Sequence, residues 1–342
     1  MPDALLDVGN LGKTFRARRS FLSRSEREDV EAVRGASFDL ERGASLGIVG
    51  ESGSGKTTLA RMLIGLEQPT EGRIVLDGRE LSGRPSHRER KERARLIQMV
   101  FQDPYTSLDP RQSTASALDE VQREHFSRSA AERAARTAEL LDAVGLGERE
   151  GRVLPRRLSG GQRQRAAIAR ALAGEPSLLI LDEAVSALDV SIQAQILNLL
   201  GRLREEFGLT YVLISHDLAV VRQLSDHVVV MYQGRIVESG PVETILSEPR
   251  HPYTQRLLAS VPRPGMGLER RTTGLLDTVT TGCRFRARCE FAFERCEEEP
   301  KLLVVDHEHD ARCWLVDGGS EPAAGAGVSD KNSRKRSNGP RA

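Results

Sequence analysis

Long apolar segments are absent from this sequence of 342 residues. No run approaches the roughly 18 consecutive apolar residues that a helix needs to cross a bilayer. The first ten residues, MPDALLDVGN, also lack the basic start and the continuous apolar stretch of a secretory signal. We therefore expect a cytosolic chain whose role at a membrane, if it has one, comes through a partner.

Net charge is nearly absent as well, because 50 basic residues face 49 acidic residues and leave a formal charge of +1. A chain held to nucleic acid by its overall field carries a large positive excess. The balance therefore argues against direct nucleic-acid binding. The 39% of hydrophobic and 29% of charged residues are typical of a globular protein with ample material for a core.

Cysteine is absent from the first 282 residues, and four cysteines then share one stretch: Cys283, Cys289, Cys296 and Cys313. Cytosolic proteins seldom keep structural disulfides, so this clustering favours a metal site. The spacing C-x5-C-x6-C-x16-C contains none of the short pairs of zinc ribbons, whereas irregular loops with four thiolates suit a [4Fe–4S] cluster. Zinc, with His307 and His309 as further ligands, and four reduced structural thiols remain alternatives. Four arginines of the same stretch are expected to offset the charge of a cluster: Arg284, Arg286, Arg288 and Arg295.

Short apolar runs alternate with helical patterns along most of the chain. Residues 4–48 are rich in β-type runs, and 178–181, 211–214 and 228–231 are continuous apolar runs of the buried parallel-strand kind. Helical periodicity covers 129–144, where Ser129 and Glu132 match a capping box, and a second helix is expected over 161–173. Strands that alternate with helices predict an α/β fold with a doubly wound parallel core, into which residues 103–157 insert as helices. Residues 317–342 have the composition of a disordered tail.

A glycine-rich segment follows the apolar run that ends at Val49 and precedes a helical pattern. It fits GxxxxGK[ST] without exception and consists of Gly50, Glu51, Ser52, Gly53, Ser54, Gly55, Lys56 and Thr57. In this context the backbone N–H groups converge on phosphate oxygens at a helix N-terminus. The pattern predicts that Lys56 reaches the β- and γ-phosphates and that the Thr57 hydroxyl ligates Mg²⁺.

Two further motifs fit a nucleotide site. The run from Leu178 to Asp182 is followed by Glu183, which places acids at the carboxyl end of a strand, where open α/β sheets bind ligands. Asp182 is expected to hold Mg²⁺ and Glu183 to polarise the attacking water. The segment LSGGQ at 158–162 puts two glycines at another helix N-terminus and predicts a second anion site. Because one γ-phosphate does not need two such sites, we expect this loop to serve a nucleotide held by another subunit.

These motifs together resemble the ATP-binding cassette (ABC) family. The chain contains, in the family's order, the Walker A loop, Gln102 in VFQDP, LSGGQ, the Walker B strand, and His216 in LISHD. Ser186 to Asp189 matches the family's D-loop. The resemblance covers about residues 4–250 and implies a P-loop NTPase (RecA-like) parallel-sheet core, an antiparallel β-subdomain and an inserted α-helical subdomain. One departure is Ala184-Val185, where many members have Pro-Thr, and it removes no group needed for chemistry.

The resemblance also implies roles for individual residues. Catalysis falls to Glu183, Gln102 and His216, and Mg²⁺ to Thr57, Gln102 and Asp182. Asp189 communicates across a dimer. The nucleotide is bound by Phe15, which stacks on adenine, and by the loop residues with Thr58. The signature residues close on the ATP of the opposite subunit; they are Ser159, Gly160, Gly161 and Gln162.

Three segments resemble one branch of the family, the ATPases of oligopeptide, dipeptide and nickel importers: VFQDPYTSLDPR, HPYT at 251–254 and GCRFRARC at 282–289. The insert between Phe15 and Val33 is similar to that of the second ATPase of such systems. This resemblance implies two transmembrane permease subunits, a second ATPase subunit as heterodimer partner, an external solute-binding protein and a peripheral place on the cytoplasmic face of the plasma membrane. A nickel or other small-solute importer and a soluble non-transport ABC ATPase are the alternatives. We expect an ATPase domain over 4–255, a cysteine-bearing extension over 256–316 and the tail beyond.

Overall fold

The computed structural model describes residues 4–16, 29–81, 83, 85–103, 107–260, 281–306 and 308–317. Most of the insert expected after Phe15, the proposed zinc ligand His307 and the tail beyond residue 317 lie outside the described residues. Among the described helices, none is long and apolar enough to cross a membrane.

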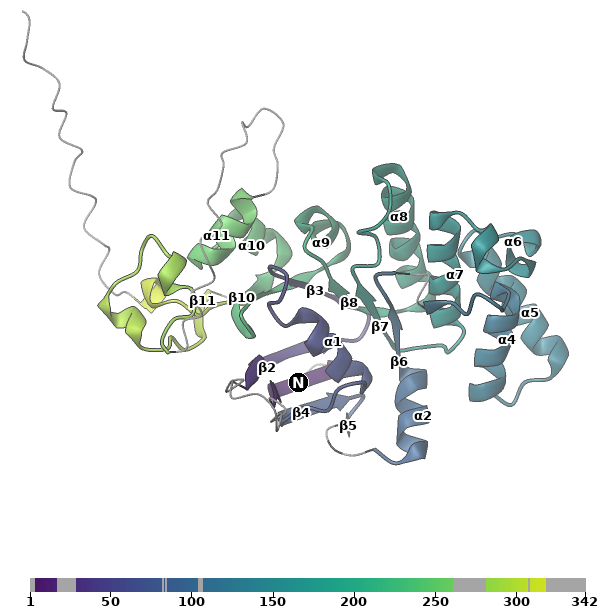
Figure 1. Cartoon of the computed structure of the whole chain (residues 1–342), viewed down its shortest axis with the longest axis horizontal. Helices are drawn as coiled ribbons and strands as arrows, with labels where there is room; N and C mark the ends of the chain where they lie inside the picture. The colour runs from purple at the N-terminus through teal and green to yellow at the C-terminus, as the bar shows by residue number, and fades with distance from the viewer. Residues whose placement is uncertain are drawn as a thin grey trace, which may run out of the picture.

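The main sheet has eight strands in the order β11-β12-β10-β9-β3-β8-β7-β6 (Figure 1). Its five parallel strands are β3 (Ser45–Val49), β6 (Ile97–Val100), β7 (Leu178–Asp182), β8 (Thr210–Ile214) and β9 (His227–Tyr232). Antiparallel pairing then adds β10 (Arg235–Pro241), β12 (His309–Ala311) and β11 (Leu303–Asp306). The predicted parallel core is therefore present, and its strands match the apolar runs of the sequence.

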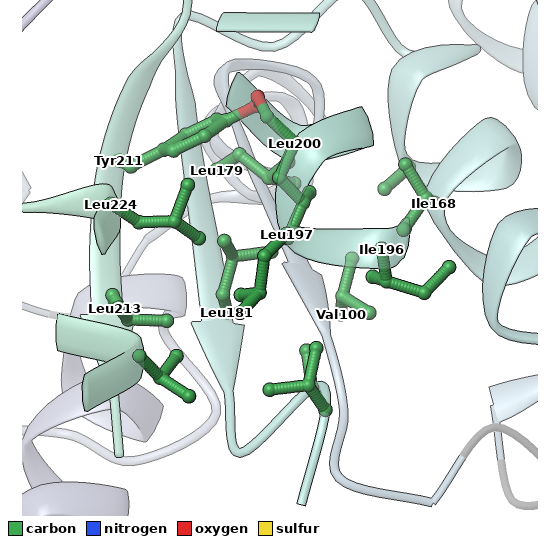
Figure 2. Packing of buried hydrophobic residues seen from close by; sticks show 14 of the residues in the cluster. Val100, Ile168, Leu179, Leu181, Ile196, Leu197, Leu200, Tyr211, Leu213 and Leu224 are labelled. Carbon is green, nitrogen blue, oxygen red and sulfur yellow. The ribbon is translucent and has the colours of Figure 1, made fainter. Parts of the chain in front are cut away.

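The parallel strands are buried on both faces, which explains why their sequences are continuous apolar runs. In β7, Leu179 and Leu181 point into one core, whereas Leu178 and Ile180 point into the other. The first core is covered by α7 (Gly160–Leu172), α8 (Val190–Phe207) and α9 (Leu218–Leu224). Figure 2 shows Leu197 and Leu200 of α8 packed over Leu179, Leu181 and Tyr211, whose hydroxyl donates to the Leu200 carbonyl at 2.9 Å.

The second core lies between the main sheet and a smaller antiparallel sheet of order β2-β1-β4-β5. The strands are β1 (Ala4–Phe15), β2 (Val30–Glu41), β4 (Glu71–Leu76) and β5 (Arg79–Glu80). Helix α1 (Lys56–Ile64) lies within this core, and the charged segment HRERKERARL forms α2 (His87–Leu96). The β-rich start of the sequence thus forms the predicted antiparallel subdomain.

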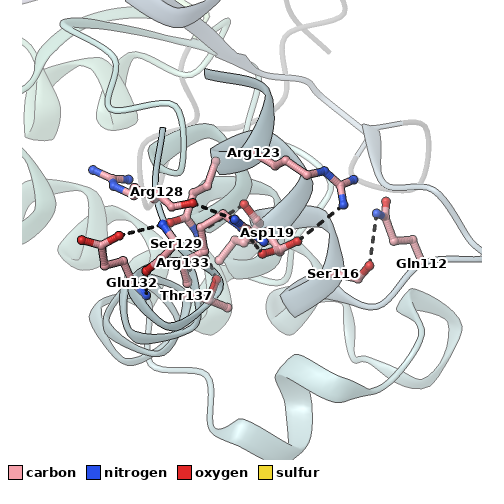
Figure 3. Close-up of polar contacts among 11 residues, drawn as sticks. Gln112, Ser116, Asp119, Arg123, Arg128, Ser129, Glu132, Arg133 and Thr137 are labelled. Atoms are coloured by element: carbon pink, nitrogen blue, oxygen red, sulfur yellow. Dashed lines mark hydrogen bonds and ion pairs between the residues drawn. The ribbon is translucent and has the colours of Figure 1, made fainter. Parts of the chain in front are cut away.

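A helical region follows β6 and lies at the far end of the molecule from the extension (Figure 1). Its described helices are α4 (Thr114–His125), α5 (Ala130–Ala143) and α6 (Glu148–Arg152), with α7 packed against them. Helix α5 begins with the predicted capping box of Ser129 and Glu132. Figure 3 shows the polar contacts of α5 with the residues before it, in which Arg133 donates to Asp119 of α4 at 2.6 Å and to the carbonyl of Arg128, in the connection between the helices, at 2.8 Å. These polar links add to the apolar packing of the helices, in which Leu118 of α4 and Leu140 of α5 are fully buried.

The C-terminal part is joined to the ATPase core and continues its sheet through β12 and β11. It begins with α10 (Val242–Ser247) and α11 (Pro252–Ala259) and contains short 3₁₀ turns. The fully buried Glu238 of β10 ties three segments together. Its carboxylate accepts hydrogen bonds from the N–H groups of Arg250 and His251, and it pairs with His309 Nε2 at 2.8 Å. Burial lowers the pKa of His251 to about 3, so this ring is neutral at physiological pH.

Candidate nucleotide-binding site

Four predicted site segments follow four neighbouring parallel strands. The phosphate loop follows β3, Gln102 follows β6, Glu183 follows β7 and His216 follows β8. Because parallel strands end at the same edge of a sheet, this order brings the four segments together. The strand order therefore explains why residues up to 166 positions apart in the sequence share one site.

The phosphate loop needs glycine at two positions for steric reasons. Gly50 has φ 152°, and a Cβ atom there would lie 2.2 Å from the Met231 carbonyl oxygen. Gly55 has φ 104°, and its Cβ would lie 2.3 Å from the Ala32 oxygen. Gly55 is also the N-cap of α1 and supplies no side chain to the free N–H groups of that helix. The loop thus presents bare backbone donors, which is the arrangement that binds phosphate.

Lys56 is held inside this loop. Its Nζ donates to the carbonyl oxygens of Gly50 at 2.7 Å and Glu51 at 2.9 Å, and lies 3.4 Å from Ser54 Oγ. Burial lowers the pKa of Lys56, while the charges of Glu183 and Asp182 oppose that shift. A buried ammonium group bound only to neutral oxygens is ready to receive the charge of a phosphate.

Asp182 ends β7 as a buried carboxylate, and Glu183 follows it. Burial and the charge of Glu183 raise the pKa of Asp182, whereas Arg61 and Lys56 lower it. Thr57 offers an exposed side chain at the first turn of α1. Carboxylate and hydroxyl oxygens are the ligands that Mg²⁺ prefers, so this donor set fits the predicted ion.

Glu183 lies between the other two predicted catalytic side chains. Gln102 Nε2 donates to one of its carboxylate oxygens at 3.0 Å, and His216 Nδ1 lies 3.4 Å from the other. Glu183 has φ 48°, a conformation that L residues seldom adopt, and its N–H donates to Ile214 of β8 at 2.9 Å. Such strain persists only where the surroundings enforce it, as they do at functional sites.

The signature segment lies in the helical region, at the start of α7. Ser159 caps the helix and forms a capping box with Gln162, with N···O distances of 2.9 and 3.2 Å. Gly161 packs against α8, because a Cβ there would lie 2.7 Å from Ile192. Asp189 is exposed at the N-cap of α8, and the next side chain, Val190, is 84% exposed. Signature and D-loop therefore share one surface.

Phe15 ends β1 with a 40% exposed side chain, opposite Val30 of β2. Lys13 Nζ lies 5.0 Å from the centroid of its ring. The same strand β2 carries Ala32, whose carbonyl oxygen faces Gly55 of the phosphate loop. An exposed aromatic ring beside the phosphate loop is suited to stacking on a base.

Two residues that hold the phosphate loop from outside it were not predictable from the sequence. The Tyr253 hydroxyl of α11 accepts the N–H of Glu51 at 2.8 Å, and Arg288 binds both carboxylate oxygens of Glu51 at 2.9 Å. Tyr253 lies in the HPYT segment and Arg288 in GCRFRARC. Those segments indicated a family branch, but nothing in their spacing indicated contact with a loop some 200 residues earlier.

The four cysteines are free thiols in the extension. Burial raises the pKa of Cys283 and Cys289 and takes that of Cys313 to about 12, and charges of neighbouring cysteines raise all three further. The thiols thus share one region. Among the described side chains, however, no group of three or more His, Cys, Asp or Glu is arranged to hold a metal ion. The described side chains therefore form no ready-made site for the predicted [4Fe–4S] cluster or for zinc.

The other groups associated with the predicted metal site have different partners in the structure. His309 Nε2 is buried against the carboxylate of Glu238. The arginines expected to offset a cluster charge are mostly paired with carboxylates, in the pairs Arg284–Glu31, Arg288–Glu51 and Arg295–Asp317.

The site combines a phosphate loop at the ends of buried parallel strands with Glu183, which has a strained backbone and lies beside Gln102 and His216. This combination defines a P-loop ATPase of the cassette class. Comparison with known proteins agrees. The ABC transporter family profile matches residues 33–186, and the profile of the oligopeptide/dipeptide transporter C-terminal region matches residues 237–296. The chain therefore belongs to the ABC transporter ATP-binding proteins that carry this C-terminal region, and it is an ATPase that uses ATP and Mg²⁺.

Curated relatives match over nearly their whole length. The probable D,D-dipeptide transport ATP-binding protein DdpF of Escherichia coli is 43% identical, over 92% of this chain and 99% of that protein. The oligopeptide transport ATP-binding protein AppF of Bacillus subtilis is 44% identical, over 92% and 98%. Among solved structures, the ATP-binding cassette MJ0796, a dimer bound to ADP and Pi, is 30% identical with a TM-score of 0.60, over 69% of this chain and 98% of that chain.

Proposed function

We propose that this chain is the ATP-hydrolysing subunit that drives import of oligopeptides or dipeptides through partner permeases. The observation that carries the proposal is similarity along both the cassette and the C-terminal region to proteins named for dipeptide and oligopeptide transport. The proposed subunit works at the cytoplasmic face of the plasma (inner) membrane as a peripheral protein. A second ATPase, two permeases and an external solute-binding protein complete the complex.

In the proposed mechanism the described residues divide the work of hydrolysis. Glu183 accepts a proton from the attacking water, which Gln102 and His216 orient, and Lys56 binds the β- and γ-phosphates. Thr57, Gln102 and Asp182 would hold Mg²⁺, which when bound neutralises phosphate charge. Nucleotide contacts come from Phe15, Thr58 and the loop N–H groups.

The opposite face of the same nucleotide is proposed to be bound by a second cassette. Gly160 and Gly161 offer N–H groups at the start of α7, whereas the Ser159 N–H donates to Gln162 in the capping box and leaves Ser159 to contribute as the N-cap. Asp189 lies beside this loop and is placed to sense the partner's nucleotide. The proposed unit boundaries stay at 4–255 and 256–316, with the helical insertion over 103–157 and the tail over 317–342.

The helical region is the proposed docking face for a permease. Helices α4, α5 and α6 surround a hollow of about 590 Å³, lined in part by Ala115, Ala138, Leu141 and Leu146. An apolar hollow of this size is suited to a short helix of a membrane partner. Gln102 precedes this region in the sequence and donates to Glu183, so we propose that it couples a docked partner to the catalytic acid.

The roles in hydrolysis are tested by Glu183→Gln. The substitution keeps the shape of the side chain but removes the base, so ATP hydrolysis should fall by about 100-fold or more. ATP binding should persist, and light scattering should show an ATP-stabilised dimer. The control is Glu243→Gln on α10, an exposed acid paired with Arg222. If Glu183→Gln hydrolysed ATP in the steady state at the rate of the unaltered chain, Glu183 would not be the base of the reaction.

The transport role is tested by recovering the tagged chain from native membranes in mild detergent and identifying its partners by mass spectrometry. Two permeases and a second ATPase are the expected partners. Recovery only from the soluble fraction, with nucleic acid or ribosomal proteins, would overturn the importer proposal. Uptake of labelled dipeptide and of nickel by cells that carry either the unaltered chain or Glu183→Gln then identifies the solute class.

We also propose that a [4Fe–4S] cluster is bound by four cysteines of the extension: Cys283, Cys289, Cys296 and Cys313. Support comes from the number of thiols and from their shared region of the extension. Protein purified without oxygen should contain iron and acid-labile sulfide, and substitution of any of the four by Ser should lower both. One zinc per chain without sulfide, or no metal at all, would contradict the cluster.

A further inference from the structure

Glu51 is the second residue of the phosphate loop, and each of its polar groups has a partner. Its N–H donates to the Tyr253 hydroxyl at 2.8 Å. Its carbonyl oxygen accepts from Lys56 Nζ at 2.9 Å. Its carboxylate receives both arms of the Arg288 guanidinium at 2.9 Å. Two of these three partners belong to the C-terminal part of the chain, outside the segment that carries the ATPase motifs.

Arg288 is itself held in place from several sides. Its guanidinium carbon lies 5.8 Å from the ring centroid of Tyr232 and 5.7 Å from that of Phe285. Arg256 of α11 donates to its carbonyl oxygen at 2.5 Å. Tyr232, Tyr253 and Phe285 pack on one another with centroids 4.6 to 5.5 Å apart. A planar guanidinium fixed this way loses little freedom on binding a carboxylate with both arms.

A carboxylate in a phosphate-binding loop presents an electrostatic problem. The Arg288 hydrogen bonds hold the pKa of Glu51 below its ordinary value, so the group stays ionised at neutral pH. An unpaired negative charge there would repel the phosphates that the loop must bind. The paired guanidinium cancels this charge and leaves the field of Lys56 and of the loop N–H groups to act on the nucleotide.

We propose that Arg288, in the cysteine-bearing extension, is a positioning residue for nucleotide binding that neutralises Glu51 and fixes it in the phosphate loop. Tyr253 supports the same residue through its N–H. The extension is thereby part of the ATP site of its own chain. This inference concerns the ATP site alone and holds whichever solute is transported.

The test is a double-mutant cycle on the full-length chain, with the affinity for ADP in Mg²⁺ measured by calorimetry. Arg288→Ala should weaken binding by about 5- to 10-fold, because the Glu51 charge is then uncompensated. In a Glu51→Gln background, where no charge remains to neutralise, the same substitution should change the affinity by less than about twofold. The loss in the single variant should also shrink at high salt.

Arg295→Ala is the matched control, because Arg295 belongs to the same extension but contacts Asp317 and Trp314 instead. It should leave ADP affinity unchanged. If Arg288 only stabilises the fold, its loss will weaken binding equally in both backgrounds, and that result would overturn the proposal, as would full affinity in Arg288→Ala. Should the alanine variant fold poorly, Arg288→Lys keeps the charge without the two-armed geometry and should weaken binding less than threefold.

Discussion

At the residue scale, Asp182 is a carboxylate that the proposed reaction needs but that lowers the stability of the fold. The carboxylate ends a fully buried strand, and burial together with Glu183 raises its pKa. The folded chain therefore binds this proton more tightly than the unfolded chain does. Wherever the folded state holds the extra proton, stability falls as pH rises, so ionised Asp182 destabilises the fold at neutral pH.

Asp182→Asn should consequently separate folding from function. We expect the variant to melt at a higher temperature than the unaltered chain at pH 7 without nucleotide, because the buried charge is gone. Its Mg²⁺-dependent ATPase rate should fall by at least about 100-fold. The gain in melting temperature should diminish as pH falls through the range where Asp182 takes up its proton. A gain that stays constant with pH would show that desolvation of Asp182 is not its source.

The residues of the candidate site could be proposed from the sequence because each belongs to a short local motif. Their contacts with residues distant in sequence could not be proposed in this way. Lys56, Asp182, Glu183 and His216 each follow an apolar run that only a buried parallel strand explains. The Arg288–Glu51 pair joins positions 237 residues apart. No periodicity or spacing encodes such a contact, because it depends on how the extension folds back over the end of β9.

At the scale of elements, helices α5 and α7 both begin with a capping box, but only α7 carries the signature segment. Ser129 with Glu132 and Ser159 with Gln162 form closely similar capping boxes. The sequence predicts a cap at Ser129 and an anion site at Ser159, and the structure shows that Ser159 is a cap as well. A signature serine that caps its own helix keeps the following N–H groups in line for a ligand.

Paired substitutions separate the two functions of the signature serine. Ser129→Ala and Ser159→Ala should each lower the free energy of unfolding by about 1 kcal/mol, because each removes one N-cap. Only Ser159→Ala should also reduce ATP hydrolysis, by about 10-fold or more, if Ser159 contacts the nucleotide of the second subunit as proposed. Denaturant unfolding and a steady-state ATPase assay give both numbers. Equal ATPase rates in the two variants would restrict Ser159 to capping.

The layered architecture was also predictable from sequence, and its limits have a physical cause. Continuous apolar runs fix the parallel strands, since both faces of each strand are buried. The short strands β11 and β12 escaped prediction because their pattern is partly exposed and because β12, which pairs with β11, joins the sheet through β10, a strand distant in sequence. The sequence offers His309 as a candidate zinc ligand, but in the structure it forms a buried pair with Glu238 that links β12 to β10.

At the scale of the whole molecule, the surface beside the signature is the one that the proposed dimer would cover. Val190 is 84% exposed at the first turn of α8, next to Asp189 and close to the signature loop. Val304 on β11 is 78% exposed, yet it lies in the extension. An exposed apolar side chain gains free energy on association only where a partner covers it.

These two valines give a matched test of the dimer. In the Glu183→Gln background, Val190→Glu should abolish or weaken by about 10-fold the ATP-dependent dimer seen by light scattering, because burial of a carboxylate at an interface is costly. The monomer should melt no earlier, since a glutamate in the first turn of α8 is favoured by the helix dipole. Val304→Glu should leave the dimer intact. If both substitutions leave the dimer intact, the Val190 surface is not the interface; if both disrupt it, the subunits associate through the extension as well.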